Sequence, residues 1–585
     1  MKKLFGRGPL TRLWLLAFAA LMGCAASPER GGDIETGQQA DQREVVMDAL
    51  QSELDRSMEG LELDDYRSPY FLAYRVDDIE ARSLSGRYGA IVEDDEERQR
   101  VAYVETRVGD YEFDNFANIS SENFRFSDYS VEQTLPIEAD AESLQSALWL
   151  LTDQSYKEAL SDFQSKKGGA VFETEDKLDV PSFSKEEPVE YEGEVVGVDF
   201  DEDRWRATIK DVTRSMLDSE PVVDSSMDVG ARRTVNYFVN SEGTRVVDEN
   251  LLYSVQIQAY ARAEDGMMLE NARSFYAHTV DELPDDETIK EEADKLVDEL
   301  EALYDSEPMD PYTGPAIVLP EASGVLFHEA VGHRLEGERQ LDDEEGRTFE
   351  GQRGERIIPE FLSVYDDPTK ETWEGMQLNG HYRYDQEGVK AERVELVEDG
   401  VLRNFLKSRT PIEDSPNSNG HGRAHSAQKP MAHMGNLIVE ASDETKTYPY
   451  EELKEKLIEE VKEQDKPYGL IIRDISGGST NTLGYGYQAF KGDARLVFKV
   501  DPETGEETLV RGVEMVGTPL TSINKIVAAS EETGVFNGYC GAESGNVPVS
   551  AIAPALLTTE VELQRSQKSK ERPPIMDAPW KRDDE

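Results

Sequence analysis

The sequence predicts an α+β protein of two domains, an N-terminal α/β domain followed by a β-rich C-terminal domain. In the first half, runs with helical spacing of apolar residues are interspersed with strand-like runs, which indicates helices packed on a sheet. The second half consists mostly of short, glycine-rich strand-like runs. With 585 residues, the chain is long enough for two or three domains with hydrophobic cores.

The first residues have the form of an export signal. Four cations and no acid precede the apolar run 13–22, which is short for a spanning helix of about 20 residues. Residues 21–24 resemble the lipobox at which bacteria cleave and acylate a cysteine. We therefore expect a signal peptide over 1–23, lipidation of Cys24, no transmembrane helix and a periplasmic location, with Ala25 favouring the outer membrane. A soluble secreted protein is the alternative.

Acidic side chains dominate the composition, and the formal net charge is −59. Such a charge repels nucleic acid and anionic lipid, so we expect no nucleic-acid partner and membrane contact through the lipid anchor alone. The acids are spread along the chain. This favours a solvated surface adapted to high salt over a docking patch for a basic partner.

The predicted N-terminal domain covers 41–307 and follows a small, polar tether at 24–40. Gly168 and Gly169 are expected to end its second helix, and residues 240–243 to form a hairpin turn. Its expected elements are helix 45–58, strands 70–76 and 101–108, helices 143–163 and 205–216, strands 235–239, 244–247 and 251–260, and helix 289–300.

Pro308, Pro311 and Gly314 mark the start of the predicted C-terminal domain, 308–566. Its first expected element is an apolar strand at 316–319, and its one clear helix lies near 451–461. The charged, proline-containing tail 567–585 is expected to be disordered.

A histidine–glutamate–histidine motif, formed by His328, Glu329 and His333, follows the strand at 316–319. In the familiar zinc-protease motif the histidines are four residues apart and share one helix face. Here they are five apart, which separates the side chains by about 140° on an ideal α-helix. A π-type turn at Gly332 would bring them back together. The alternative is an ordinary amphipathic helix with two incidental histidines.

Catalytic zinc typically takes three protein ligands and a water, and Cys540 is the best third candidate. If Cys24 is lipidated, Cys540 has no intramolecular disulfide partner, because the chain has two cysteines. The flanking glycines would allow close backbone approach, and coordination would protect the thiolate. A buried inert thiol is the competing interpretation, and Glu336 and Glu338 are rival ligands.

These residues predict peptide-bond hydrolysis with Zn²⁺ as the cofactor. Zinc lowers the pKa of its water to about 7 and polarises a carbonyl. Glu329 is the predicted general base, which accepts the water's proton and delivers it to the leaving amine.

A second group of histidines comprises His421, His425 and His433. The first two are four residues apart and could mimic a second metal site, but nearby glycines and Pro430 argue against a helix there. Arg423 or His425 is predicted to contact the substrate or to support the ligands, with a hydrogen-bonded loop as the alternative.

Residues 324–337, Gly-Val-Leu-Phe-His-Glu-Ala-Val-Gly-His-Arg-Leu-Glu-Gly, resemble the metal motif of the TldD/PmbA family of metallopeptidases. Cys540-Gly541 and residues 547–549 also match, and 385–388 and 477–478 fit more weakly. The resemblance covers most of the mature sequence.

The resemblance implies that His328, His333 and Cys540 are the metal ligands and that Glu329 is the catalytic glutamate. It also implies the two-domain TldD/PmbA-like fold and a dimer enclosing a narrow cavity for unfolded peptides. Because the motif is kept, the chain looks like a TldD-type, catalytically competent partner in a homodimer or in a heterodimer with a homologue.

Two other functions compete with this prediction. A dipeptidyl peptidase III-like enzyme also uses the five-residue histidine spacing, but it would need a downstream paired-glutamate motif that the sequence does not contain. An envelope lipoprotein that binds peptides or a partner without cleaving them is the non-enzymatic alternative.

Overall fold

The computed structural model describes residues 36–62, 66–116, 133–138, 140–170, 180–341, 345–413, 415–483 and 489–566. The predicted signal peptide, the lipidation residue Cys24, most of the tether and the predicted tail lie outside these residues. Within these ranges, no helix combines the length and the apolar character that a bilayer crossing requires.

The first half is built on a long, curved sheet. Among the described residues this sheet has six strands in the order β2-β1-β4-β5-β3, with β6 also paired to β5. The strands are β1 (Pro69–Arg87), β2 (Ala90–Val108), β3 (Glu190–Glu192), β4 (Val222–Asn240), β5 (Arg245–Arg262) and β6 (Met268–Ala277). The helices are α1 (Thr36–Gly60), α2 (Ala141–Ala170), α3 (Glu202–Ser215) and α4 (Asp286–Asp305), with the 3-10 turns η2 (Met216–Asp218) and η3 (Val280–Glu282).

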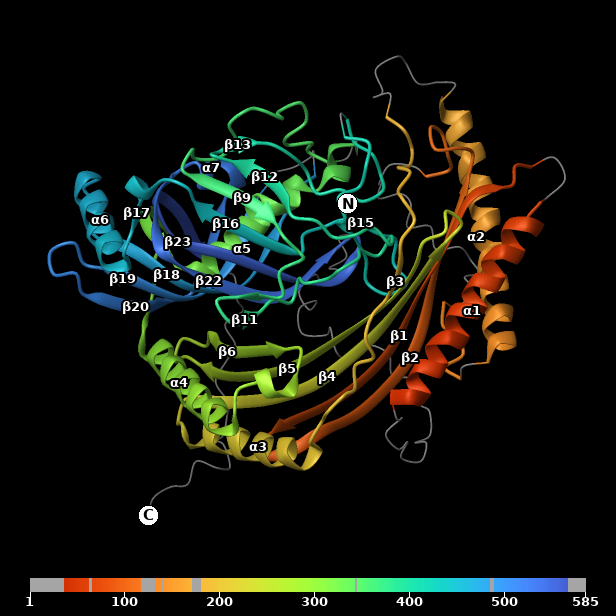
Figure 1. The fold of residues 1–585 in the computed structure, drawn as a ribbon. Coiled ribbons are helices and arrows are strands. Elements are labelled where there is room, and N and C mark those ends of the chain that lie inside the picture. The colour runs from red at the N-terminus through yellow and green to blue at the C-terminus, as the bar shows by residue number, and fades with distance from the viewer. Residues whose placement is uncertain are drawn as a thin grey trace, which may run out of the picture.

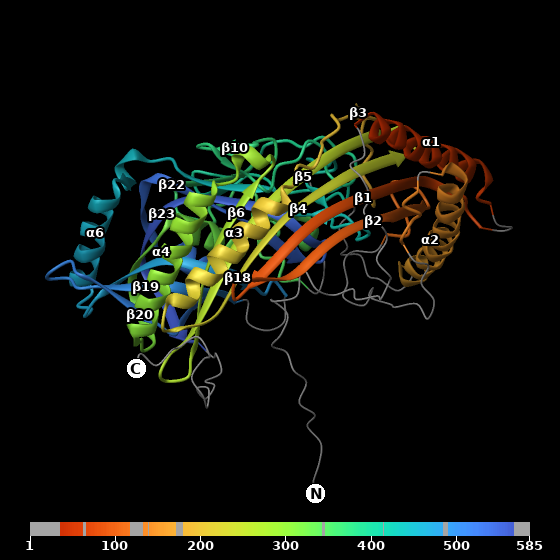
Figure 2. The same cartoon turned by 90° about the horizontal axis from the view of Figure 1, so that it is seen from below.

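Two pairs of helices cover this sheet at its opposite ends. α1 and α2 lie at one end, and α3 and α4 lie at the other (Figures 1 and 2). Apolar residues of α1 and α2 form a core with β1 and β4, while those of α3 and α4 form a core with β4 and β5. The helical spacing in the sequence therefore marked the buried faces correctly.

The predicted hairpin turn at 240–243 is confirmed. β4 and β5 pair as far as Val239 and Arg245, and Gly243 adopts a φ of +102°, which favours glycine. The two strands expected at 244–247 and 251–260 are instead one strand, β5. The polar residues between them do not break it, because Glu249 is buried and accepts hydrogen bonds from Arg43 and Arg233.

Two other boundaries differ from the expected ones. α1 begins at Thr36, so the last five residues of the predicted tether are helical. Gln and Ala at 38–40 are good helix formers, and they extend the helix that the later apolar residues stabilise. α2 continues through Gly168 and Gly169 to Ala170, so these glycines do not end it.

The second half is built on a larger mixed sheet, which has 13 strands within the described ranges. They are β7 (Glu307–Pro308), β8 (Tyr312–Val318), β9 (Leu362–Asp366), β12 (Val394–Glu398), β13 (Val401–Leu402), β16 (Asn436–Ala441), β17 (Thr447–Tyr448), β18 (Gly469–Thr480), β19 (Phe490–Val500), β20 (Glu507–Arg511), β21 (Val513–Gly517), β22 (Ile526–Ala542) and β23 (Gly545–Arg565). β23 pairs with β8, β16, β21 and β22, which makes it the centre of this sheet.

Short elements surround this sheet. Two small ribbons are formed by β10 (Thr372–Trp373) with β11 (Met376–Gln377), and by β14 (Gly422–Arg423) with β15 (Met431–Ala432). The helices are α5 (Pro320–Ala330), α6 (Tyr450–Glu463) and α7 (Pro519–Ile523), with the 3-10 turns η4 (Gly332–Leu335), η5 (Gly337–Gln340) and η6 (Glu444–Lys446). The helix predicted near 451–461 is confirmed as α6.

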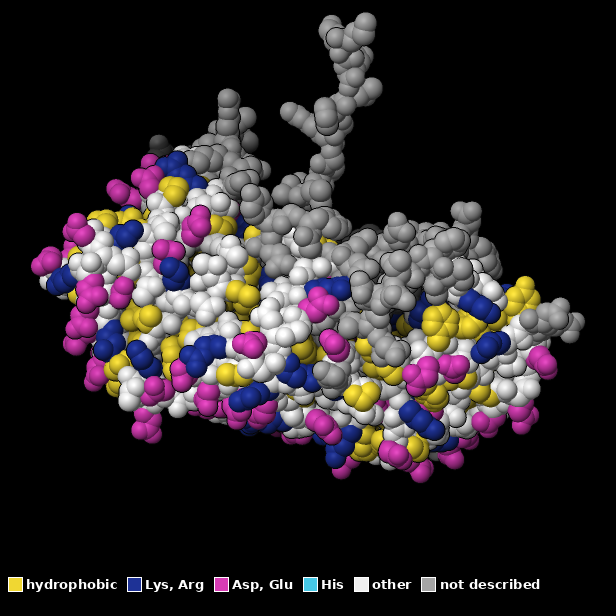
Figure 3. All heavy atoms as spheres, turned by 90° about the horizontal axis from the view of Figure 1, so that it is seen from above, with side chains coloured by type: hydrophobic (Ala, Val, Ile, Leu, Met, Phe, Trp, Pro, Cys, Tyr) yellow, Lys and Arg dark blue, Asp and Glu magenta, His cyan; other side chains and the backbone are white. Residues whose placement is uncertain are grey.

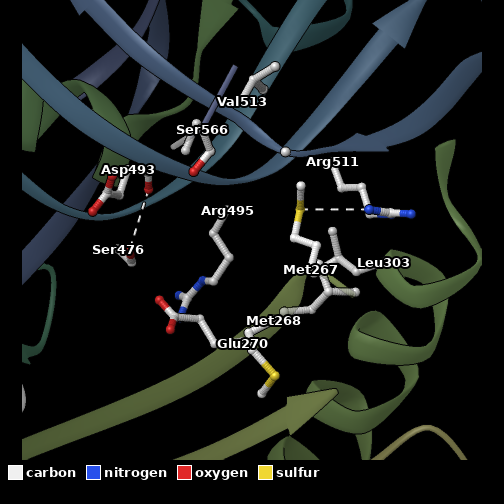
Figure 4. A pocket seen from close by; sticks show the side chains of 13 residues that line it. Met267, Met268, Glu270, Leu303, Ser476, Asp493, Arg495, Arg511, Val513 and Ser566 are labelled. Atoms are coloured by element: carbon white, nitrogen blue, oxygen red, sulfur yellow. Dashed lines mark hydrogen bonds between the residues drawn. The ribbon is translucent and has the colours of Figure 1, made fainter. Parts of the chain in front are cut away.

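The two halves share packing at their junction. The core around α4 extends to Leu496 of β19. A cleft beside it is lined by Met267, Met268 and Leu303 from the first half and by residues of β18 to β21 from the second (Figure 4). Arg511 crosses the junction, because its Nε donates to the Ser306 carbonyl oxygen at 2.9 Å and its Nη1 lies 3.6 Å from Met267 Sδ.

Acidic and basic side chains are interspersed on the face seen in Figure 3, with no large patch of one sign. This agrees with the distribution of acids along the sequence. The cleft in Figure 4 contains none of the residues that the sequence singled out for chemistry.

Candidate metal centre

α5 carries the first two residues of the motif and packs tightly on the large sheet. β8 ends at Val318, and the helix starts with Pro320, whose missing N–H is tolerated in a first turn. Gly324 faces β23, where an added Cβ would lie 2.9 Å from the Ala551 carbonyl oxygen. The glycine therefore lets the helix approach the strand and sets the depth of His328 and Glu329.

The predicted π-type turn is wrong. α5 ends at Ala330, and the 3-10 turn η4 follows at Gly332. This change of helix type reorients His333, so that the ring centroids of His328 and His333 lie 4.9 Å apart at an interplanar angle of 89°. Gly332 is needed for a different reason, since an added Cβ would lie 2.1 Å from Met434 Sδ.

Cys540 reaches the two histidines from β22, more than two hundred positions later in the chain. It pairs with Val547 of β23, and its Sγ lies 3.4 Å from His333 Nε2. One potential ligand atom from each of His328, His333 and Cys540 lies within 4.8 Å of the other two, and all three residues are buried. The structure thus brings together the three side chains that the sequence predicted as ligands.

The chemistry of this group suits a divalent metal ion. The buried Nδ1 of His328 has no hydrogen-bond partner among the described residues. Burial, aided by the charge of Arg339, lowers the pKa of His333 to about 3, so its imidazole is neutral and able to ligate. Burial also raises the pKa of the Cys540 thiol, and a bound cation would offset this. Two imidazoles and one thiolate are ligands that zinc accepts.

Glu329 lies beside this group. Its Oε2 is 4.0 Å from His333 Nε2. Burial raises the pKa of Glu329 to about 7, with the charge of Glu336 acting in the same direction and Arg334 opposing it. Gly478 of β18 packs against the side chain, and an added Cβ there would lie 2.5 Å from Glu329 Cγ. A carboxylate with a pKa near neutrality can exchange protons efficiently at physiological pH.

Glu336 contacts the His333 ring on the side opposite Cys540. Its Oε1 lies 2.9 Å from His333 Nδ1, an arrangement that leaves His333 Nε2 facing Cys540. The other oxygen, Oε2, accepts from Arg339 Nε at 2.6 Å. The rival carboxylate Glu338 is bound by other groups, since it accepts hydrogen bonds from the Ser408 hydroxyl and from the Ala432 backbone N–H.

His433 is a residue whose place at the site the sequence did not indicate. One of its ring nitrogens lies within 4.8 Å of His333 and Glu336 ligand atoms, and its buried Nε2 has no hydrogen-bond partner among the described residues. Its only signal in the sequence is membership of the group with His421 and His425.

Among the described residues, the other two histidines of that group, His421 and His425, belong to neither cluster of potential metal ligands. His421 is buried between Asp366 and Asn419, and His425 is exposed with its backbone N–H bonded to the Ser544 carbonyl. Arg423 is buried and donates to the carbonyl oxygens of Met434 and Pro548. The hydrogen-bonded loop describes these residues best, and substrate contact by Arg423 or His425 stays a prediction.

Comparisons with known proteins relate the second half of the chain to metallopeptidases. Residues 311–565 match the family model of the PmbA/TldA metallopeptidase C-terminal domain. A metalloprotease of Methanocaldococcus jannaschii is 32% identical over 235 residues, which are 40% of this chain and 47% of the relative. A zinc metalloprotease TldD homolog of Saccharolobus solfataricus is 25% identical over 42% of this chain and 51% of the relative. The chain thus spans about half the length of these curated relatives.

The fold extends further than the sequence similarity. The solved structure of TldE from Thermococcus kodakarensis covers 88% of this chain and 100% of its own, with a TM-score of 0.56 and 14% sequence identity. This likeness concerns the fold alone. It confirms the predicted α+β class with a β-rich C-terminal domain, and the family match supports a metallopeptidase type for the second half.

Proposed function

We propose that this protein is a zinc-dependent peptidase that hydrolyses peptide bonds in unfolded peptides or small proteins. The observation that carries the proposal is the convergence of two imidazoles and one thiol beside a buried glutamate. These groups come from α5, η4 and β22. An incidental pair of histidines on one helix would not require a cysteine from a distant strand to meet them.

The residues divide into a metal-holding set and a proton-transfer group. His328, His333 and Cys540 would hold the ion, which as a Lewis acid polarises a peptide carbonyl and acidifies water. Glu329 accepts the proton of the attacking water and returns it to the leaving amine. Glu336 orients the His333 ring through Nδ1. The close contact with Gly478 fixes the carboxylate of Glu329 beside the ligands.

Metal analysis and peptide cleavage by the purified protein test this proposal. We expect about one zinc per active subunit. Glu329→Gln should abolish cleavage of an unfolded peptide while retaining the metal, because the amide cannot accept a proton but keeps the shape of the side chain. A wild-type protein without zinc, or a Glu329→Gln variant that cleaves normally, would reject the enzyme in favour of a peptide-binding protein.

The proposal includes a location and a partner. Acylation at Cys24 would hold the enzyme on the periplasmic side of the outer membrane, and a second copy or a TldD/PmbA homologue would complete a dimer. Membrane fractionation of wild type and Cys24→Ala, together with light scattering of the purified protein, measures both. Equal partition of wild type and Cys24→Ala into the membrane fraction would contradict the lipid anchor. A strictly monomeric mass would contradict the dimer.

A further inference from the structure

The guanidinium of Arg339 joins the two parts of the chain that carry the proposed ligands. Its Nε donates to Glu336 Oε2 at 2.6 Å, and Glu336 in turn contacts His333 Nδ1. On the opposite side, Arg339 Nη2 donates to Glu543 Oε2 at 2.8 Å. Glu543 follows Cys540 by three positions, in the turn between β22 and β23. One side chain thus spans from the histidine segment to the cysteine segment.

The carboxylates around Arg339 favour arginine over lysine at this position. The residue is 6% exposed, and its Nη1 also donates to Glu345 Oε1 at 2.8 Å. Three carboxylates therefore share one guanidinium. Without that cation they would repel one another, and the two segments would lose their direct ionic link. The planar fork of arginine fits this arrangement, whereas lysine offers a single point charge.

We propose that Arg339 is a positioning residue that holds the helix-borne and strand-borne metal ligands in one set by binding Glu336 and Glu543 at the same time. This inference rests on the proposed metal site. Glu336 fixes the direction of the His333 ring, and Glu543 fixes the end of β22 next to Cys540. The distance of 3.4 Å between His333 Nε2 and Cys540 Sγ then depends on Arg339, although this residue is no ligand.

Cobalt binding separates this role from general stabilisation, because a thiolate-to-cobalt charge-transfer band reports on Cys540 independently of the histidines. The full-length protein is stripped of metal and titrated with Co²⁺ in four forms: wild type, Arg339→Lys, Glu543→Gln and the double variant. The control is Arg356→Lys, which alters an exposed arginine paired with Glu360 in the same half of the chain.

We expect Arg339→Lys to bind Co²⁺ about 10–100-fold more weakly, the range seen when residues that orient metal ligands are changed. Its charge-transfer band should lose intensity relative to the ligand-field bands. Glu543→Gln should show the same defect in milder form, and the double variant should be no worse than Arg339→Lys, because both changes break one link. The control should match the wild type.

Three results would overturn the inference: wild-type affinity with a full charge-transfer band in Arg339→Lys, independent addition of the two defects, or an undiminished band in Glu543→Gln. If Arg339→Lys does not fold, the milder Glu543→Gln variant still decides, because Glu543 is 43% exposed and lies at the surface end of the link. A wild-type protein that binds no Co²⁺ would instead reject the proposed metal site itself.

Discussion

The two segments that meet at the candidate metal centre reach it by different means. Residues 320–340 place His328, Glu329 and His333 through local backbone geometry, an α-helix that changes to a 3-10 turn. The β22–β23 hairpin places Cys540 through the register of a sheet, in which residue 540 faces residue 547. The first segment therefore depends on close packing around its backbone, and the second depends on strand pairing.

One glycine from each segment, Gly332 and Gly541, shows the same difference. An added Cβ at Gly332 would lie 2.1 Å from Met434 Sδ, whereas at Gly541 the nearest atom would be Asn546 Oδ1 at 3.8 Å. The expectation of close approach at the glycines that flank Cys540 is therefore wrong for Gly541, whereas at Gly538 an added Cβ would lie 2.9 Å from Phe536 Cε1. In the hairpin the ladder of hydrogen bonds fixes the position of the cysteine, and an added Cβ at Gly541 would meet no close neighbour.

Removal of the strand-borne ligand is the strongest challenge to this comparison. We expect Cys540→Ala to weaken zinc binding by about 100-fold or more, because only two imidazoles would remain. Competition against a chromophoric chelator measures the affinity. Val547→Ala, which alters the paired residue on β23, is the control and should bind zinc nearly as well as wild type. Retention of tight binding by Cys540→Ala would remove β22 from the site.

Alanine substitutions at the two glycines test the packing difference directly. Gly332→Ala should lower the free energy of unfolding by about 1–3 kcal/mol, because Met434 is fully buried and cannot yield easily. Gly541→Ala should stay within about 0.5 kcal/mol of wild type. Urea unfolding of the metal-free proteins gives both values, and equal losses would show that the two segments do not differ in this way.

A third pair of variants tests whether close packing also positions Glu329, the proposed general base. Gly478→Ala should lower kcat about tenfold or more, because its Cβ would displace Glu329, while the zinc content stays unchanged. Gly477→Ala is the matched control, since an added Cβ there meets nothing within 4 Å. Steady-state kinetics and metal analysis check both variants, and identical kcat values would contradict the proposed contact.

The smallest expected effect concerns Glu543 on the hairpin. Burial alone would raise the pKa of Glu543, but Arg339 outweighs it and lowers the pKa to about 2. A carboxylate with a lowered pKa stabilises the fold above its unfolded pKa of about 4.3, and this stabilisation is lost as the pH falls through about 2. Because the side chain is 43% exposed, Glu543→Gln should cost less than about 1 kcal/mol at pH 7.

Unfolding of the metal-free wild type and Glu543→Gln between pH 7 and pH 3 measures this effect. The difference in the free energy of unfolding should shrink over the acid part of the range. A difference that grows as the pH falls would mean that the ionised carboxylate does not stabilise the hairpin end of the site.

Much of the regular structure was predictable because the signals are local. The apolar spacing of α3, α4 and α6 and the hairpin turn before β5 are confirmed. Two of the errors arose where a distant contact accompanies a departure from local preference. The ion pairs of Glu249 keep β5 continuous through a polar stretch, and the contact of Gly332 with Met434 accompanies a 3-10 turn where a π-type turn was expected.

The sequence by itself determined that two histidines and a glutamate lie within six consecutive residues, whereas their convergence required the change from α-helix to 3-10 turn. It also supplied the candidate cysteine through its isolation from any disulfide partner. Only the tertiary structure decided that Cys540 lies against His333, that Glu336 stands behind that ring and that Arg339 reaches Glu543. These contacts depend on strand register and on the packing of α5 against β23, and residues so far apart in the chain leave no local pattern of such contacts.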